Sequence, residues 1–181
     1  MRAFVALDLP ESWRDDLECL QVHLRTGRVV PAENLHLTLA FLGDVSEAVL
    51  EEIHESLDHV PKPGIRLRIL GLDLFGSATA PRLVCAVVDD SQILRDLQSR
   101  VARLARSAGL DLERRRFRPH VTLARFGRTA RADPMALSAF LADHGGFHLP
   151  ETRFHAMGLY ASTLRPDGAE YQALGIYPLA P

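Results

Sequence analysis

Hydrophobic and polar positions alternate in two stretches of the chain that are nearly identical. Residues 36–40 read His-Leu-Thr-Leu-Ala, residues 120–124 read His-Val-Thr-Leu-Ala, and a glycine follows shortly after each stretch. Such alternation is typical of a strand, in which residues two apart share one face. The histidine and threonine of each copy therefore share a face, opposite apolar side chains that point toward a core. Because the repeat keeps the polar face as well as the apolar one, it predicts a function for both strands.

Apolar residues at helical spacing predict four helices, each bounded by a residue that commonly starts or ends a helix. Gly27 and Gly109 are expected to end the first and third helices. Asp44 with Glu47 is expected to open the second as a capping box, and Asp133, before a proline, to open the fourth. The expected helices occupy about residues 13–24, 47–60, 91–108 and 134–144. The other strands are expected at about residues 4–9, 65–69, 83–88, 147–154, 157–163 and 171–177, the last two as a hairpin around residues 165–168.

The order strand, helix, histidine strand, helix, strand occurs twice, at about residues 3–75 and 83–157, and the hairpin follows. A period of about 80 residues is too long for a solenoid repeat. The order predicts an α+β fold in which residues 1–181 form a single bilobal domain with pseudo-two-fold symmetry. Two mostly antiparallel sheets would face a central cleft, with the helices on the outside. The histidine strands would then line the cleft, where a ligand is expected to bind.

Composition limits the classes of partner and the compartment. The 181 residues carry a net charge of −2, so a contact with nucleic acid needs a local basic patch. The run Arg114, Arg115, Arg116 and Arg118 is either that patch or a solvated loop. No apolar run is long enough to span a bilayer, and the first residues lack the apolar core of a signal peptide. A soluble, cytoplasmic protein without membrane contact is expected.

The two cysteines have neither the spacing of a metal site nor that of a disulfide framework. Cys19 falls in an expected helix and Cys85 in an apolar strand, and both are expected to be buried thiols. Six further histidines lack a threonine two residues away, and most of them are expected to be solvated. These are His23, His54, His59, His144, His148 and His155.

The repeated polar face carries the groups that phosphoryl transfer without a metal would need. Near neutral pH one imidazole can be a neutral base while the other is a charged acid. Hydroxyls at Thr38 and Thr122 can donate hydrogen bonds to phosphoryl oxygens. A single His-x-Thr is more often structural, but two copies in matching positions favour catalysis by His36 and His120. A binuclear metal site is the competing interpretation, and it is disfavoured because no acidic residue falls at ligand spacing beside either histidine. A ribose 2′,3′-cyclic phosphate, with its strained internal leaving group, suits such a site.

Phe41 and Arg125 occupy equivalent positions, each five residues after a histidine. Strict alternation turns both side chains away from the histidine face. They can take part in the site only where the strand ends, twists or bulges before them.

Together these stretches resemble the two-histidine phosphoesterase superfamily, and within it the bacterial and archaeal RNA 2′,3′-cyclic phosphodiesterases, also named 2′-5′ RNA ligases. The similarity lies in residues 36–43, which end in Phe-Leu-Gly, and in residues 118–125, which read Arg-Pro-His-Val-Thr-Leu-Ala-Arg. It also covers residues 2–7 and 162–171, so it runs from end to end. The resemblance implies a bilobal fold, no metal or cofactor, and RNA or nucleotides with 2′,3′-cyclic phosphate ends as substrates.

The resemblance also implies a role for each candidate residue. His36 would be the acid toward the departing 3′-oxygen and His120 the base toward water, so that hydrolysis leaves a 2′-phosphomonoester. Thr38 and Thr122 would bind phosphate oxygens, Arg125 would hold the phosphodiester with a two-pronged contact, and Phe41 would lie near the nucleobase. Ligation of 2′-5′ ends in the same cleft, or a binding module without catalysis, are the alternatives. Because one chain completes the site, a monomer without an obligate protein partner is expected.

Overall fold

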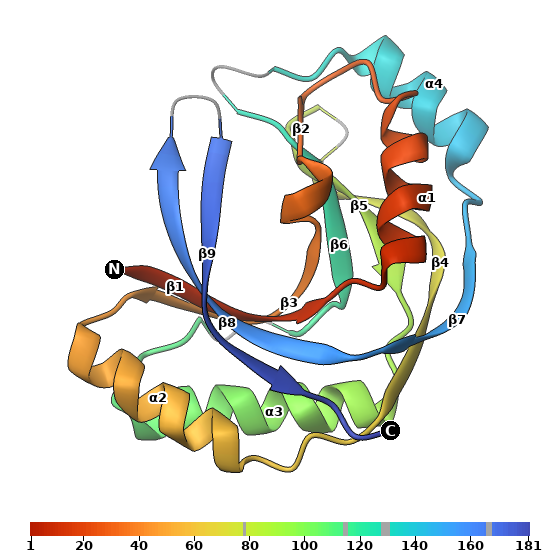
Figure 1. Cartoon of the computed structure of the whole chain (residues 1–181). Helices are drawn as coiled ribbons and strands as arrows, with labels where there is room; N and C mark the ends of the chain where they lie inside the picture. Colours follow the sequence, from red (N-terminus) through yellow and green to blue (C-terminus); the bar gives the residue numbers. More distant parts are fainter. Residues whose placement is uncertain (78, 114–115, 128–130, 166–167) are drawn as a thin grey trace.

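Nine strands form one antiparallel sheet, and four α-helices pack outside it (Figure 1). The computed structural model describes residues 1–77, 79–113, 116–127, 131–165 and 168–181, and these statements apply to that part of the chain. The strands are β1 (Arg2–Asp8), β2 (Arg28–Val29), β3 (His36–Asp44), β4 (Ile65–Gly76), β5 (Pro81–Val88), β6 (His120–Arg125), β7 (Leu149–Phe154), β8 (Ala156–Arg165) and β9 (Gly168–Pro178). The helices are α1 (Glu11–Gln21), α2 (Glu47–His59), α3 (Gln92–Ser107) and α4 (Pro134–His144), with a 3-10 turn at Ala32–Asn34. The expected α+β class is confirmed.

The sheet consists of two halves that meet where β3 lies beside β6. The strand order is β7-β4-β5-β6-β3-β1-β8-β9, with the short β2 also on β6. A single residue pair, Leu37 with Val121, joins the halves. Both side chains are fully buried, so the junction is anchored in the core. The expected two sheets are thus continuous, and the histidine strands are neighbours in one sheet. The pseudo-two-fold symmetry stays a prediction.

The two halves of the sheet do not coincide with the two segments of the sequence. The strand β4 closes the first segment, yet it pairs with β5 and β7 of the second. The strand β1 of the first segment pairs with β8, which belongs mainly to the C-terminal hairpin. The hairpin itself is confirmed by the pairing of β8 with β9, although residues 166–167 of its turn lie outside the described residues. The boundaries of the internal duplication remain a prediction.

Each of the first and third helices follows a strand of one half and packs against the other half. Helix α1 follows β1, but its Trp13 meets the ring of Phe154 on β7 edge-on, with ring centroids 5.1 Å apart. Helix α3 follows β5, and Gln98 on it donates a hydrogen bond to the carbonyl of Leu39 on β3. Figure 1 shows α1 and α4 on one side and α2 and α3 on the other. Each of these helices therefore connects the two halves of the sheet. Each apolar side chain that they bury contributes about 2 kcal/mol to the stability of the fold.

Two helix ends agree with the sequence and two do not. The Asp133 carboxylate accepts hydrogen bonds from two backbone N–H groups and caps α4, and Gly109, with φ of +86°, follows α3. The other two expectations are wrong. Ser46, not Asp44, caps α2, because Asp44 still pairs with β1 as the last residue of β3. Helix α1 ends at Gln21, well before Gly27.

The two cysteines are both free thiols, but their environments differ. Cys85 is buried in β5, as expected. Cys19 is exposed, which contradicts the expectation of a buried thiol. The reason is the direction of α1, which turns Trp13, Leu17 and Leu20 toward the core and leaves Cys19 outside that stripe. Across the described residues, no helix has the length and apolar character needed to cross a membrane.

Candidate active site

The repeated polar residues gather on one face of the junction between β3 and β6. His36, Thr38, His120 and Thr122 are half-buried, while the alternating residues between them are buried. The pair Leu37 with Val121 fixes the register. Extended by one residue on either side, that register sets each histidine opposite the threonine of the other strand. The histidines then lie on a diagonal, roughly 7–8 Å apart in a regular strand pair.

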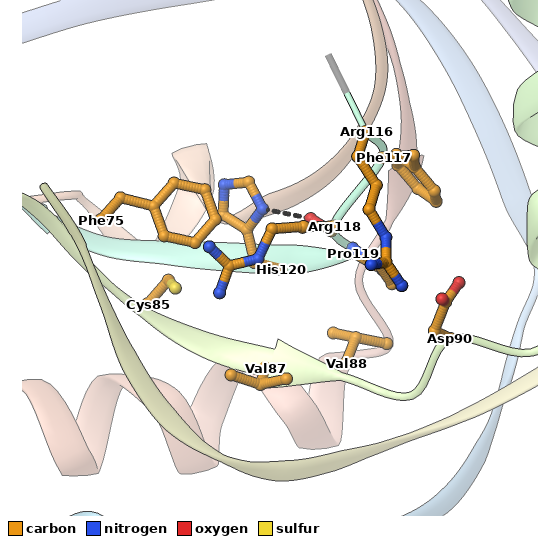
Figure 2. Close-up of a pocket in the computed structure, with 10 residues that line it drawn as sticks. All are labelled: Phe75, Cys85, Val87, Val88, Asp90, Arg116, Phe117, Arg118, Pro119 and His120. Carbon is orange, nitrogen blue, oxygen red and sulfur yellow. Dashed lines mark hydrogen bonds between the residues drawn. The ribbon is translucent and has the colours of Figure 1, made fainter.

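Each imidazole is held by the backbone through the same ring nitrogen. The Nδ1 of His36 lies 2.7 Å from the carbonyl oxygen of Asn34, and the Nδ1 of His120 lies 2.6 Å from that of Arg118 (Figure 2). A carbonyl oxygen can only accept, so Nδ1 donates in both contacts. The Nε2 atom of each ring is therefore the one available to exchange a proton with a ligand.

An aromatic ring packs on each histidine. Phe4 lies 4.8 Å from His36 and Phe75 lies 4.6 Å from His120, measured between ring centroids. Tyr171 adds an edge-on contact with His36 at 5.3 Å. These rings fix the orientation of the imidazoles and exclude water from one side of each.

Both histidines have lowered pKa values, mainly because burial disfavours the charged ring. The pKa of His36 is lowered to about 4; the Asn34 carbonyl opposes this shift, and the charges of Arg125 and His120 add to it. The pKa of His120 is also lowered by burial, against the Arg118 carbonyl and with the charges of Arg125 and Arg118. The Arg125 guanidinium thus acts on both rings. Without a ligand, both imidazoles are neutral at pH 7.

A bulge interrupts β3 just after its polar pair. Thr38 pairs with Ala6 of β1, but Ala40 pairs with Val5, the next residue of that strand, so Leu39 has no partner of its own. One extra residue reverses the alternation of side chains from that point on. The sequence alone does not show this bulge.

The strand β6 carries a matching bulge. Val84 and Cys85 are adjacent on β5 but pair with Ala124 and Thr122, so Leu123 between them is the extra residue. The two bulges bring Phe41 and Arg125 to the face of the histidines, which is the condition for their taking part in the site. Phe41 lies opposite Phe4 with ring centroids 6.2 Å apart and is 63% exposed. Arg125 is exposed.

Glutamines from two helices hold the bulged backbone. The buried side chain of Gln21 on α1 donates to the carbonyls of Val30 and Leu123, at 2.8 and 2.9 Å. Gln98 on α3 donates to the carbonyl of Leu39 at 3.3 Å. Carbonyls displaced at a bulge thus gain partners from side chains, and the helices help to fix both strands.

A half-buried carboxylate next to His36 was missed by the sequence reasoning. Asp8 pairs with His36 across β1 and β3, and it accepts a hydrogen bond from the hydroxyl of Tyr160. Burial raises the pKa of Asp8, and this hydrogen bond partly offsets the rise. The ring of Tyr160 lies over Gly158 and stacks on Phe4 at 5.4 Å. An acidic residue at the end of an otherwise apolar strand was the only signal.

Arg118 is fixed beside His120 by two contacts. Its Nη2 donates to the carboxylate of Asp73 at 2.6 Å, and its guanidinium carbon lies 4.4 Å from the ring centroid of Phe75. Of the expected basic run, Arg114 and Arg115 lie outside the described residues.

The six other histidines lie away from this arrangement, and all but His144 are exposed, as expected for most of them.

One pocket adjoins each histidine strand. The first measures about 310 Å³ and reaches His120 (Figure 2). The second measures about 460 Å³ and includes Asn34 and Tyr171, both of which contact His36. Among the described residues, no group of three or more His, Cys, Asp or Glu side chains could hold a metal ion. The arrangement can transfer protons on two sides of an anion that Arg125 attracts.

Comparisons with known proteins agree with this arrangement. An Aeropyrum pernix protein named RNA 2′,3′-cyclic phosphodiesterase is 35% identical over 162 residues, which cover 89% of this chain and 89% of its own. An Aquifex aeolicus protein of the same name is 30% identical over 178 residues, covering 94% and 93% of the two chains. The crystal structure of Escherichia coli LigT complexed with 3′-AMP has a TM-score of 0.79 and 26% identity, covering 99% and 98%. The family described as the 2′-5′ RNA ligase superfamily matches residues 9–159, and this chain belongs to it.

Proposed function

We propose that this protein hydrolyses the 2′,3′-cyclic phosphate ends of RNA or nucleotides to 2′-phosphomonoesters. The observation that carries the proposal is the pair of half-buried imidazoles on neighbouring strands, each with Nδ1 bound to a backbone carbonyl. This leaves two Nε2 atoms to act on one phosphate. Relatives named RNA 2′,3′-cyclic phosphodiesterase support the same substrate class.

The proposed reaction is an in-line displacement at phosphorus. The Nε2 of His120 removes a proton from a water molecule as its oxygen bonds to phosphorus. The bond from phosphorus to the 3′-oxygen breaks, and the protonated Nε2 of His36 supplies the proton that this oxygen takes up. The 2′-oxygen keeps the phosphate. His120 then returns its proton to solvent and His36 regains one, which completes the cycle. The anionic substrate favours the protonated form of His36 when it binds.

The other candidate residues bind the phosphate in this proposal. Thr38 and Thr122 donate hydroxyl hydrogen bonds to its nonbridging oxygens. Arg125 offers two parallel N–H groups to the charge that builds up on those oxygens. Phe41, exposed on the same face, is available to a nucleobase. No step in this scheme needs a metal ion.

The same geometry accepts a 5′-hydroxyl in place of water, which would give 2′-5′ ligation. Both histidines come from one chain, which supports a monomeric enzyme. Two free thiols are typical of the reducing cytoplasm, where we propose that it acts on RNA ends.

The proposal is tested by identifying the product. The protein is incubated in EDTA with adenosine 2′,3′-cyclic phosphate and with an oligoribonucleotide that ends in a cyclic phosphate, and the products are identified by phosphorus NMR. A 2′-phosphomonoester is expected from the wild type, and none from the double variant His36→Ala, His120→Ala. A 3′-phosphomonoester would show that the other P–O bond breaks. Absence of turnover, or turnover that EDTA abolishes, would overturn the proposal.

A further inference from the structure

We infer that the pocket beside His120 binds the nucleotide that precedes the cyclic phosphate in an RNA chain. The protein would then prefer RNA ends to cyclic mononucleotides. This inference rests on the proposed function and specifies its substrate class.

The pocket combines an apolar interior with basic side chains. Phe75, Arg118 and His120 form one end of it, and Arg116 and Asp90 lie at the other (Figure 2). The rest of its lining is apolar or weakly polar and consists of Cys85, Val87, Val88, Phe117 and Pro119. A volume of about 310 Å³ lies at the small end for ligand pockets, so it suits one base with its sugar and not a longer strand. Aromatic rings and a guanidinium plane are the usual partners of an unstacked base.

The arrangement of charge indicates a second phosphate. Hydrolysis of a cyclic mononucleotide involves a single phosphate, and the charge of Arg125 already acts on both histidines. Arg116 and Arg118 line the pocket instead, Arg118 at the end beside His120 and Arg116 at the other end. A single phosphate between the two histidines therefore leaves Arg116 without a partner.

The two carboxylates near this pocket form ion pairs with arginines other than Arg116. Arg118 is paired with Asp73 at 2.6 Å, and Asp90 is paired with Arg95 at 2.9 Å. In the part of the chain that the structure describes, Arg116 forms no ion pair. Asp90 lies at the same end of the pocket as Arg116 but is paired with Arg95, so the charge of Arg116 is in excess in this pocket. The phosphodiester on the 5′ side of the terminal ribose supplies the opposite charge, and the nucleoside attached to it would fill the apolar interior.

Three substrates separate the contributions of the second phosphate and the second base. They are adenosine 2′,3′-cyclic phosphate, its 5′-phosphorylated form, and the dinucleotide ApA ending in a 2′,3′-cyclic phosphate. For the wild type we expect kcat/KM to rise at each step, by roughly tenfold or more in total. For Arg116→Ala we expect the ratio of kcat/KM between the dinucleotide and the mononucleotide to fall by about tenfold. The matched control is Arg103→Ala, which removes an exposed arginine from α3 and should leave the ratio unchanged.

Equal kcat/KM for the three substrates would overturn the inference and leave the proposed function standing. An equal loss on mononucleotide and dinucleotide in Arg116→Ala would also overturn it, because Arg116 would then serve the terminal nucleotide. If no substrate is turned over, the proposed function fails, and the pocket is then tested by measuring ligand affinities with titration calorimetry. The 2′-phosphorylated dinucleotide should then bind about tenfold more tightly than adenosine 2′-phosphate, and Arg116→Ala should remove the difference. Equal affinities would exclude this pocket as the binding site of the preceding nucleotide.

Discussion

Gln21 of α1 donates a hydrogen bond to the carbonyl of Leu123, the residue that bulges from β6 two positions before Arg125. The same amide nitrogen also donates to Val30, so it links two backbone segments. Gln98 of α3 makes the corresponding contact with Leu39 on β3. Helices that lie outside the sheet therefore help to hold the two bulges that turn the residues after each histidine toward the site.

The replacement Gln21→Met should reduce both stability and activity. It keeps the size of the side chain but removes the donor to the half-buried Val30 carbonyl and one of the two donors to the Leu123 carbonyl, which keeps the Val30 N–H at 2.8 Å. We expect a cost of about 1 kcal/mol of unfolding free energy. Because Leu123 precedes Arg125, we also expect a rise in KM for a cyclic mononucleotide. Urea unfolding and steady-state kinetics measure the two effects. The exposed Gln172→Met is the control, and a variant as stable and active as that control would contradict the prediction.

Replacing either proposed catalytic histidine should remove most of the rate. For His36→Ala and His120→Ala we expect kcat to fall by about 10²- to 10⁴-fold, the usual contribution of a general acid or base. The double variant should lose much less than the product of the single losses, since the two groups act in one step. His59→Ala is the matched control, because the Nδ1 of His59 also meets a backbone carbonyl, that of Glu55, but the ring is exposed on α2. Near-normal rates in either single variant would exclude this site.

A sulfur-substituted substrate should distinguish the acid from the base. A cyclic phosphate whose 3′-bridging oxygen is replaced by sulfur has a leaving group that needs little protonation. If His36 is the acid, the defect of His36→Ala should shrink by at least about tenfold on this substrate. The defect of His120→Ala should persist, because activation of water is unaffected. Rescue of His120→Ala instead would exchange the two roles.

The faces of the histidine strands could be predicted from the sequence because side-chain direction in a strand depends only on local alternation. His36 with Thr38, and the apolar Leu37 on the opposite face, follow that rule. The bulges do not, since Leu39 and Leu123 become extra residues only through their pairing with β1 and β5. No glycine or proline marks either position, so the sequence did not predict which face the side chains after each bulge would take.

Long-range pairing also explains two of the other differences from the sequence-based expectations. The strand β4 joins β5 because the chain turns back directly after Gly76, which no local pattern assigns to one half of the sheet or the other. Asp8 comes into contact with the site only because β1 lies beside β3. For β4 and Asp8 the missing information is the identity of a distant neighbour. Cys19 is different, because the helical spacing of Trp13, Leu17 and Leu20 already places position 19 outside the apolar stripe.

The lowered pKa values predict an acidic optimum for kcat/KM. Catalysis requires one neutral and one protonated imidazole, and the pKa of His36 is lowered from 6.5 to about 4 while that of His120 is also lowered. The rate should therefore rise as the pH falls from about 8 and should reach its maximum below pH 6.5. A maximum above pH 7 would contradict this prediction.

The same shifts make the folded protein less stable in acid. Between pH 6.5 and about 4 the unfolded chain binds protons that the folded His36 does not, so the free energy of unfolding decreases as the pH falls. Circular dichroism at each pH should therefore accompany the kinetics. In His36→Ala this part of the pH dependence of stability should be lost, which urea unfolding at several pH values would show.

The replacement Tyr160→Phe should destabilise the protein more at neutral than at acidic pH. It removes the hydroxyl that donates to Asp8, and a half-buried carboxylate that loses this donor costs about 1 kcal/mol. Loss of the donor raises the pKa of Asp8 further, so the cost should shrink as the pH falls and the carboxyl becomes protonated. Urea unfolding at pH 7 and at about pH 4 measures both values. Tyr171→Phe is the matched control, since that hydroxyl forms no hydrogen bond within the described residues. A cost that is equal at both pH values would show that the hydroxyl does not act through the charge of Asp8, since the variant keeps the ring that stacks on Phe4.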